Sequence, residues 1–389
     1  MLMAGHLSPM RRNWDIFCSV VDNFGDIGVC WRLARRLSAG LGQEVRLWVD
    51  DLVSFKRLTG DVDASLAVQH IDGIEVRHWV DPFPDVAPAQ TVVEGFGVRL
   101  PEHFIEAMAK MSPAPIWINL EYLSAETWVD EHHCLPSPHP RLPLTKYFFF
   151  PGFSSATGGV LIEDNLFSQR DAQQADPAGA RRFRHEIGIA GDDEPRTWIS
   201  LFCYGAAALP SLVEAWAADP SGVCCVVAEG YAQAQMEEIA GRKLRPGMPV
   251  EIGNLTVHAI PFLPLEQYDR LLWSCDLNFV RGEDSFVRAQ LAARPLIWQA
   301  YPQEDEAHLV KTAAFRERYV QALPVADAGA YAAVFDAWNR QDRECGTAWP
   351  EFARRLPAFQ ANAGQWAAKL AGNGDLAANL VRFCEDRLK

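Results

Sequence analysis

Residues 14–28 read WDIFCSVVDNFGDIG, and this stretch decides the fold class. Its first eight residues form a nearly continuous apolar run, which is typical of a parallel strand buried on both faces. A glycine-containing turn follows, and residues 29–38 then place apolar side chains at helical spacing. The succession of strand, glycine turn and helix predicts the first βα unit of an α/β fold.

The rest of the chain repeats this alternation, which implies parallel sheets. In the first half we expect further strands at residues 45–49, 74–79, 91–94, 116–120 and 146–150. In the second half we expect strands at 197–203, 222–228, 255–259, 277–280 and 296–299, followed by helices at 304–321 and from 327 onward. The pattern predicts two Rossmann-like, doubly wound domains that face each other across a cleft.

A polar, acidic stretch at residues 164–196 separates the two halves, and we interpret it as the domain junction. It predicts an N-terminal domain over 1–165 and a C-terminal domain over 166–370. The last segment, 371–389, is expected to be a helix that can pack back on the N-terminal domain. In open parallel sheets ligands bind beyond the carboxyl ends of the strands, so the chemistry is expected in the loops after residues 21, 203, 259 and 280.

Composition excludes several classes of protein. The 389 residues carry a formal charge of −14, which disfavours binding to nucleic acid or to anionic membranes. No apolar run approaches the roughly 20 residues that span a bilayer. The start lacks the apolar core of a signal peptide, and Met10 could be the native start. The nine cysteines show no CxxC spacing, which favours reduced thiols in a cytoplasmic protein.

The loop at residues 22–28 is the first candidate site. Gly25 and Gly28 permit close backbone approach and positive φ, and the amides that open the next helix can receive an anion. Asp22 and Asp26 lie four residues apart, a spacing that puts both on one face if the helix begins early. The alternative is an Asp helix cap with turn chemistry and no catalytic role.

The second candidate is the stretch at residues 276–290, DLNFVRGEDSFVRAQ, which runs from a strand into a helix. Arg281 can form a forked contact with a diphosphate, and Ser285 or Asp284 is a natural N-cap. Glu283 and Asp284 oppose a phosphate's charge, so we expect them to hold sugar hydroxyls or a cationic acceptor. The alternative is a capped helix with an Arg–Glu surface pair.

Aromatic residues gather near the same expected rim, and a nucleobase needs a flat apolar face on which to stack. They are Phe202, Tyr204, Phe262 and Tyr268, although aromatics in strands more often belong to the core. Two possible metal motifs are weaker. Asp61-Val-Asp63 has the DxD spacing that binds a metal in one glycosyltransferase class, but it lies in a polar stretch with no clear strand after it. His132-His133-Cys134 could ligate a metal, but it has no partner cluster nearby in sequence, and the alternative is a solvated loop.

Residues 14–35 and 279–290 together resemble the EarP family of bacterial protein-arginine rhamnosyltransferases, which modify translation elongation factor P. The resemblance extends from Trp14 to the C-terminal helices. It implies a GT-B fold, with an acceptor-side N-terminal domain and a nucleotide-sugar-binding C-terminal domain. It also implies dTDP-β-L-rhamnose as donor, an arginine of elongation factor P as acceptor, inversion at the anomeric carbon, and no metal or other cofactor.

The resemblance also assigns site residues. The family's essential carboxylates match Asp22, Asp26 and Glu283. Substrate contacts are expected from Asn23, Phe24, Gly25, Tyr204, Phe262, Leu265, Tyr268, Arg281, Gly282, Asp284 and Ser285. One departure is visible, because relatives often carry Gln where this chain has Leu265.

The chemistry of the acceptor explains why such a site would hold several carboxylates. A guanidinium is protonated at neutral pH and its lone pairs are delocalised, so the site must bind the cation, orient one nitrogen and remove a proton. We expect Asp26 to be the general base, Asp22 to orient it or the acceptor, and Glu283 to fix the donor or the guanidinium. The alternatives are a GT-B transferase that glycosylates a small molecule or a carbohydrate, and a non-catalytic nucleotide-sugar sensor.

Overall fold

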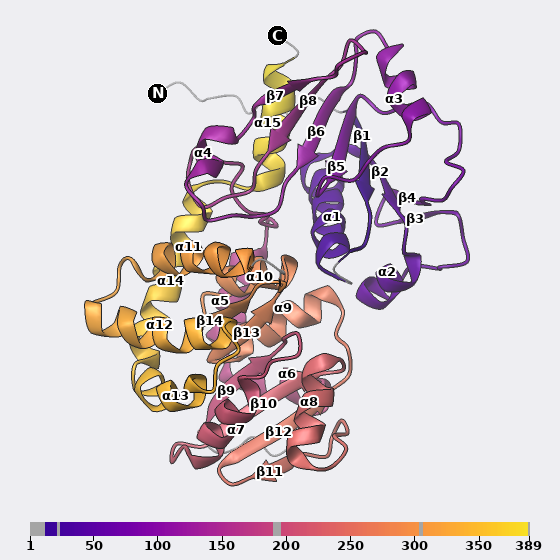
Figure 1. The fold of residues 1–389 in the computed structure, drawn as a ribbon. Helices are drawn as coiled ribbons and strands as arrows, with labels where there is room; N and C mark the ends of the chain where they lie inside the picture. Colours follow the sequence, from indigo (N-terminus) through magenta and orange to yellow (C-terminus); the bar gives the residue numbers. More distant parts are fainter. Residues whose placement is uncertain (1–11, 22–23, 190–195, 303–305, 388–389) are drawn as a thin grey trace, which may run out of the picture. The chain divides into compact units, whose positions relative to one another are not determined.

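The computed structural model describes residues 12–21, 24–189, 196–302 and 306–387. The expectations for Asp22, Asn23 and Met10 therefore lie outside the described residues. The chain is a mixed α/β protein with two parallel sheets, which confirms the predicted fold class (Figure 1). It divides into an N-terminal unit, residues 1–164 together with 371–389, and a C-terminal unit, residues 165–370.

The sheet of the N-terminal unit has the order β3-β4-β2-β1-β5-β6-β8-β7. Its parallel strands are β1 (Asn13–Cys18), β2 (Glu44–Val49), β4 (Ile74–His78), β5 (Thr91–Gly95), β6 (Ile116–Leu120) and β8 (Thr145–Phe149). Two antiparallel strands form the edges, β3 (Val68–Ile71) and β7 (Pro136–Pro138). All six parallel strands were predicted from their apolar runs, whereas the two edge strands were not.

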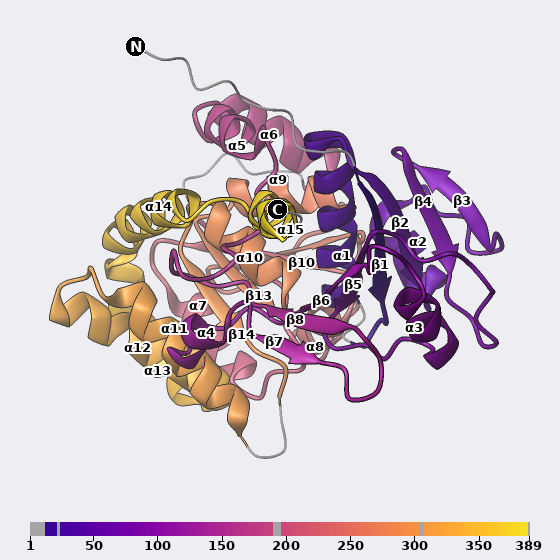
Figure 2. The same ribbon diagram turned by 90° about the horizontal axis from the view of Figure 1, so that it is seen from above.

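Both faces of this sheet are covered by helices, which explains why its central strands β1, β5 and β6 are almost entirely buried. On one face a core cluster joins Phe17 of β1 and Trp48 of β2 to Phe104 of helix α3 (Glu102–Ala109). Helix α1 (Gly25–Arg35) packs against β1 and β2, and Figure 2 shows it on the side of the sheet away from α3. The unit is completed by α2 (Leu52–Thr59), the π-helical turn η1 (Arg36–Gly40) and α4 (Trp128–His132).

The start of the chain differs in register from the sequence prediction. Strand β1 ends at Cys18 rather than at residue 21, because its pairing with β2 stops there and the following residues bind Asp50 instead. Helix α1 begins at Gly25 rather than at residue 29. Gly25 and Gly28 lie within this helix and have no positive φ, so the expected glycine turn is instead the first turn of α1.

The segment after residue 370 belongs to the N-terminal unit. Its helix α15 (Leu376–Asp386) is capped by Asp375, whose carboxylate also accepts a hydrogen bond from Arg36 Nε at 3.0 Å. The Phe383 ring of α15 meets the rings of Tyr147 and Phe149 on β8, at centroid distances of 5.4 and 5.6 Å. Apolar contacts and a buried ion pair thus attach the last helix to the first sheet.

The sheet of the C-terminal unit has the order β11-β12-β10-β9-β13-β14. Its parallel strands are β9 (Thr197–Leu201), β10 (Val223–Ala228), β12 (Leu255–Ile260), β13 (Leu277–Arg281) and β14 (Leu296–Gln299). The antiparallel edge strand is β11 (Val250–Ile252), which the sequence analysis did not predict.

Helices cover this sheet on both faces as well. A core cluster packs α6 (Pro177–Glu186) and α9 (Leu265–Ser274) against Trp198 of β9. On the other face, Phe279 of β13 contacts Trp216 of α7 (Leu209–Ala218) and Trp338 of α12 (Val325–Asn339). The remaining helices are α5 (Leu166–Gln174), α8 (Tyr231–Ala240), α10 (Asp284–Leu291), α11 (Ala307–Val320), α13 (Glu344–Arg354) and α14 (Leu356–Gly372).

Each sheet has a point at which its strand order reverses. In the N-terminal unit this point lies between β1 and β5, and in the C-terminal unit it lies between β9 and β13. The loops that leave two such neighbouring strands diverge to opposite faces and leave a crevice beyond the carboxyl ends, where ligands bind in doubly wound folds. The fold therefore directs attention to the loops after β1, β5, β9 and β13.

Candidate active site

The loop after β1 is anchored by two carboxylates. Asp50, which follows β2, accepts hydrogen bonds from the Ser19 hydroxyl and from the Val20 amide at 2.9 Å. Asp26 accepts one from the Val21 amide through its Oδ2 atom, also at 2.9 Å. The backbone up to residue 21 is thereby fixed relative to the first turn of α1.

Asp26 is buried, with 1% of its surface exposed. It does not cap α1, because the N-cap is Phe24, whose side chain makes no capping bond. Its Oδ1 atom accepts a hydrogen bond from the Tyr122 hydroxyl at 3.1 Å. Both oxygens of this carboxylate are therefore oriented by neighbours on different segments of the chain, and the helix-cap alternative for Asp26 is wrong.

A buried thiol on which Asp26 acts, that of Cys18, is held in its neutral form. A hydrogen bond with Cys30 and burial raise the pKa of Cys18 well above the usual range of a thiol, and the charges of Asp26 and Asp50 act in the same direction.

Tyr122 is a site residue that the sequence analysis missed. It follows β6, and its ring stacks on the ring of Phe96, which follows β5, with centroids 4.4 Å apart and planes 18° apart. The two loops lie at the carboxyl ends of neighbouring strands, so the rule that ligands bind there could have singled them out. No motif marks them, however, because the pairing depends on contacts between distant segments.

In the C-terminal unit the crevice is occupied by Arg281, the last residue of β13. Its Cζ atom lies 4.5 Å from the ring centroid of Phe202, 4.4 Å from that of Tyr204 and 5.4 Å from that of Tyr231. The side chain is 7% exposed, and its buried Nη1 atom has no hydrogen-bond partner among the described residues. A desolvated, unsatisfied guanidinium nitrogen is costly unless a ligand completes its bonding.

The segment after Arg281 turns sharply into helix α10. Gly282 adopts a φ of 64°, a left-handed conformation that glycine tolerates without strain. Glu283 is the N-cap and makes no capping bond, while Asp284 lies in the first turn. The Ser285 hydroxyl bonds back to the amide and the carbonyl of Arg281 rather than capping the helix, so the expected caps are wrong.

The predicted aromatic rim is partly core and partly accessible. Tyr204 is fixed by Gln299 Oε1, which accepts its backbone N–H at 2.8 Å. Tyr268 packs on the core cluster and lies 5.8 Å from the Phe202 ring, and burial raises the pKa of its hydroxyl, which therefore stays protonated. Phe262 is half-buried, and Leu265 is 4% exposed at the first position of α9.

The remaining N-terminal candidates, Phe24 and Gly25, begin helix α1. The Phe24 ring lies 5.7 Å from the Cζ atom of Arg57 on α2. Phe24, the N-cap of α1, and Asp26, in its first turn, thus lie at the same end of this helix. Among the C-terminal candidates, Phe202 and Tyr204 contact Arg281, and Tyr268 contacts Phe202.

The histidine motif serves a structural purpose. His133 Nδ1 accepts a hydrogen bond from the Phe150 amide at 3.1 Å, and burial lowers the pKa of His133 to about 4. The Nδ1 atom of His132 contacts the Trp128 carbonyl at 2.8 Å. Asp63 accepts bonds from Ser65 in a local turn. Within the described ranges, no group of three or more potential ligands could hold a metal ion.

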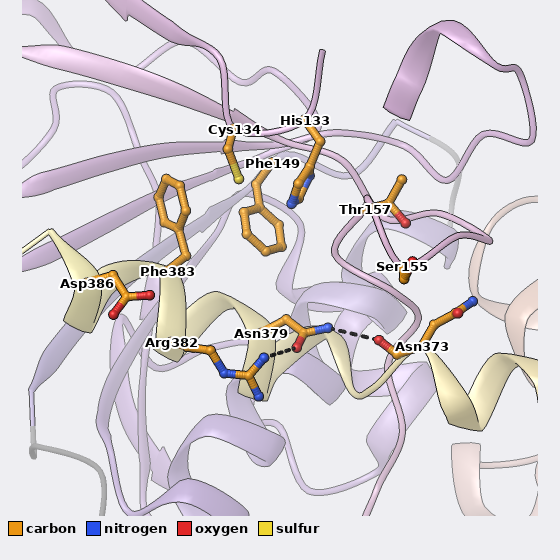
Figure 3. Close-up of a pocket in the computed structure, with 10 residues that line it drawn as sticks. All are labelled: His133, Cys134, Phe149, Ser155, Thr157, Asn373, Asn379, Arg382, Phe383 and Asp386. Atoms are coloured by element: carbon orange, nitrogen blue, oxygen red, sulfur yellow. Dashed lines mark hydrogen bonds between the residues drawn. The ribbon is translucent and has the colours of Figure 1, made fainter. Parts of the chain in front are cut away.

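One hollow of about 260 Å³ lies in the N-terminal unit, beside α15. Figure 3 shows His133 and Phe149 on one side of it, with Asn379 and Arg382 on the other. Its amides are engaged in holding the C-terminal segment, since Asn379 Nδ2 donates to the Gly158 carbonyl at 3.0 Å. None of the predicted site residues lines this pocket.

Two further expectations concern the whole chain. All nine cysteines are free thiols, and eight of them are buried. Among the described residues, no helix is both long and apolar enough to cross a membrane.

Comparison with known proteins decides the family. A sequence model of the family described as Elongation-Factor P (EF-P) rhamnosyltransferase EarP matches residues 14–385. The chain belongs to the EarP family. Protein-arginine rhamnosyltransferases of Pseudomonas putida and Pseudomonas aeruginosa are each 44% identical to it, over 97% of this chain and 100% of their own length. A homologue from Neisseria meningitidis is 33% identical over 96% of this chain and 97% of its own.

Solved structures agree with this assignment. One, described as the structural basis for EarP-mediated arginine glycosylation of translation elongation factor EF-P, has a TM-score of 0.70 and 32% identity over 97% of this chain and 99% of its own. The spinosyn rhamnosyltransferase SpnG has a TM-score of 0.51 and 14% identity over 97% of this chain and 100% of its own, a likeness of fold alone. This EarP-family chain is therefore a GT-B glycosyltransferase, an enzyme that rhamnosylates a protein arginine.

Proposed function

We propose that this EarP-family enzyme transfers L-rhamnose from dTDP-β-L-rhamnose to an arginine side chain of elongation factor P, with inversion at the anomeric carbon. The names of its relatives support the acceptor, and the two crevices described above support the chemistry. A translation factor as acceptor would place the enzyme in the cytoplasm.

The donor side of the proposal depends on one observation, the buried and unsatisfied Nη1 of Arg281. A diphosphate would supply the missing acceptor and form a charge-assisted bond with a guanidinium that is already desolvated. The first amides of α10 have no intrahelical partners, so they can bind the same phosphates. Ser285 would contribute by holding the backbone of Arg281, and its own amide, rather than its hydroxyl, would face the ligand.

We assign the nucleoside to the aromatic side of this crevice. Tyr204 and Phe202 flank the Arg281 guanidinium, and Phe262 and Leu265 follow strand β12 of the same sheet. A base could stack on these rings, with Tyr268 supporting them from the core. Leu265 offers methyl groups in place of an amide, so any polar contact to the base at this position would come from the backbone.

On the acceptor side we assign Asp26 the role of general base. As an arginine nitrogen forms its bond to the sugar's anomeric carbon, the bond from that carbon to the diphosphate oxygen breaks. The attacking nitrogen passes one proton to Asp26, dTDP leaves, and the product guanidinium keeps its positive charge. Attack from the face opposite the leaving group converts the β-linkage of the donor into an α-linkage.

The other carboxylates would share the binding of the cation and the sugar. Glu283 is the N-cap of α10 and is 7% exposed, which suits a group that holds sugar hydroxyls or the guanidinium inside a crevice. Asp22 and Asn23 precede Asp26 by only a few residues and are assigned to orienting it or the acceptor. With no metal proposed, Arg281 and the α10 amides would stabilise the charge that develops on the diphosphate.

The decisive assay incubates the enzyme with elongation factor P and dTDP-β-L-rhamnose and analyses the factor by peptide mass spectrometry. We expect one deoxyhexose residue on one arginine, and nuclear magnetic resonance of the glycopeptide should show an α-anomeric linkage. Unmodified elongation factor P, together with consumption of the donor on a small-molecule or carbohydrate acceptor, would overturn the proposal. A β-linked product would overturn only the inverting mechanism.

A further inference from the structure

The residues beside Asp26 that carry no assigned role are Tyr122 and Phe96. The Tyr122 hydroxyl lies 3.1 Å from Asp26 Oδ1, and its ring stacks on that of Phe96. The three side chains come from the segments that follow β1, β6 and β5, and β1 and β5 are the strands between which the sheet order reverses. They therefore form one contiguous group in the crevice of the N-terminal unit.

Phe96 has an unfavourable backbone conformation, and two hydrogen bonds to β6 hold the turn in which it lies. Its φ is 61°, a left-handed conformation that is unfavourable for a bulky L-residue. Two residues at the end of β6 hold the turn. The Phe96 amide donates to the Leu120 carbonyl at 2.7 Å, and the Gly97 amide donates to Asn119 Oδ1 at 3.0 Å. Glycine would adopt this turn at lower cost, and this chain has an aromatic residue there instead.

Tyr122 stays accessible although its ring is stacked and its hydroxyl is bonded. It is 37% exposed, whereas Asp26 beneath its hydroxyl is 1% exposed. An accessible aromatic ring next to a buried carboxylate offers a guanidinium group one contact for its flat face and another for its N–H edge. That group is planar and cationic, stacks on aromatic faces, and donates hydrogen bonds in its own plane to carboxylates.

We propose that Tyr122, supported by Phe96, positions both partners of the proton transfer. Its hydroxyl orients Asp26 through Oδ1, and the ring face that Phe96 does not cover receives the guanidinium of the acceptor arginine. The bonds from Tyr122 and Val21 hold one oxygen of Asp26 each and so fix the plane of the carboxylate that takes the proton. Tyr122 itself gains and loses no bond in the reaction.

This inference rests on the proposed function, and three variants with one control test it. Tyr122→Phe removes only the hydroxyl, Tyr122→Leu also removes the ring, and Phe96→Gly removes the supporting ring while suiting the positive φ. Tyr147→Phe is the matched control, because Tyr147 is also a ring-contact tyrosine of this unit and meets Phe383. Rates are measured against elongation factor P at saturating dTDP-β-L-rhamnose, after circular dichroism confirms that each variant folds.

The expected pattern separates the two tasks. Tyr122→Phe should lower kcat by about tenfold to a hundredfold with little change in the KM for elongation factor P, since a hydrogen bond to a charged group is lost. Tyr122→Leu should add a rise of about threefold to thirtyfold in that KM, and Phe96→Gly should show mainly the KM effect. Tyr147→Phe should match the wild type in both constants.

The pH dependence of kcat provides a readout that a purely structural role would not change. Without the Tyr122 hydroxyl, the charged form of the base loses a donor, so the acidic limb of the profile for Tyr122→Phe should move to higher pH. Asp26 acts electrostatically on Cys18, as do Cys30 and Asp50, and this variant leaves Cys18, Cys30 and Asp50 in place.

The failure of this inference is distinct from failure of the proposed function. If the wild type modifies elongation factor P and the Tyr122 and Phe96 variants retain its kcat, its KM and its pH profile, the positioning role is overturned. If the wild type itself transfers no rhamnose to elongation factor P, the proposed function fails first.

Discussion

The guanidinium carbon of Arg281 lies 4.4 Å from the centre of the Tyr204 ring. This contact joins the end of β13 to the loop after β9, the two strands between which the second sheet reverses its order. Aromatic rings hold the Arg281 cation in place, and its Nη1 atom has no hydrogen-bond partner among the described residues. The guanidinium is therefore preorganised to bind an anionic ligand.

Replacing Arg281 by lysine should weaken the binding of dTDP by about tenfold to a hundredfold. A lysine cannot make a forked contact and does not stack on Tyr204 as a planar group does. Isothermal titration calorimetry measures this directly. Arg270→Lys is a suitable control, because Arg270 also lies over a ring, that of Phe183 at 4.2 Å, and has no proposed donor contact. Equal affinities for both variants would remove Arg281 from the donor site.

Replacing Leu265 by glutamine should lower the melting temperature of the free enzyme. The side chain is 4% exposed, so an amide there loses hydration, at a cost of about 1–3 kcal/mol unless it finds a partner. If the amide reaches the base, dTDP should raise the melting temperature of the variant more than that of the wild type. Thermal-shift measurements with and without dTDP test both parts. An unchanged melting temperature with an unchanged ligand shift would contradict them.

His133 should make stability depend on pH. Burial lowers its pKa from 6.5 to about 4, so the unfolded chain takes up a proton in a range where the folded chain does not. Stability is therefore complete above about pH 6.5 and is lost progressively as the pH falls towards about 4. Because the ring is only part-buried, the loss should stay near 1–2 kcal/mol.

The variant His133→Asn, which can keep an acceptor for the Phe150 amide, should flatten this part of the pH profile in denaturant titrations. His132→Asn is the matched neighbour, because His132 is exposed. The same pH dependence in both variants would show that another group is responsible.

The sequence predicted the features that depend on residues next to one another in the chain, and it missed several that depend on other segments. The buried parallel strands were predicted because an apolar run of five or six residues with flanking turns reports burial on both faces. The edge strands β3, β7 and β11 escaped because they are short, partly polar and stabilised by only one neighbour. The start of α1 was placed four residues late, since glycine normally argues against a helix and Gly25 opens this one.

The site was predicted unevenly for the same reason. Asp26 and Arg281 stand out because each follows an apolar strand and precedes a helix. Tyr122 and Tyr231 do not stand out, because their roles depend on contacts with Asp26 and Arg281, which are distant in sequence. The caps expected at Asp284 and Ser285 failed because the Ser285 hydroxyl turns back to the Arg281 backbone.

The central claim is that the Asp26 carboxylate accepts the proton of the attacking arginine, and Asp26→Asn tests it most directly. The amide has nearly the same shape and can still accept a bond from Tyr122, but it is not a base. Turnover on elongation factor P should fall by about 10²–10⁴ while the affinity for dTDP stays close to that of the wild type. Near-normal turnover by this variant would contradict the account.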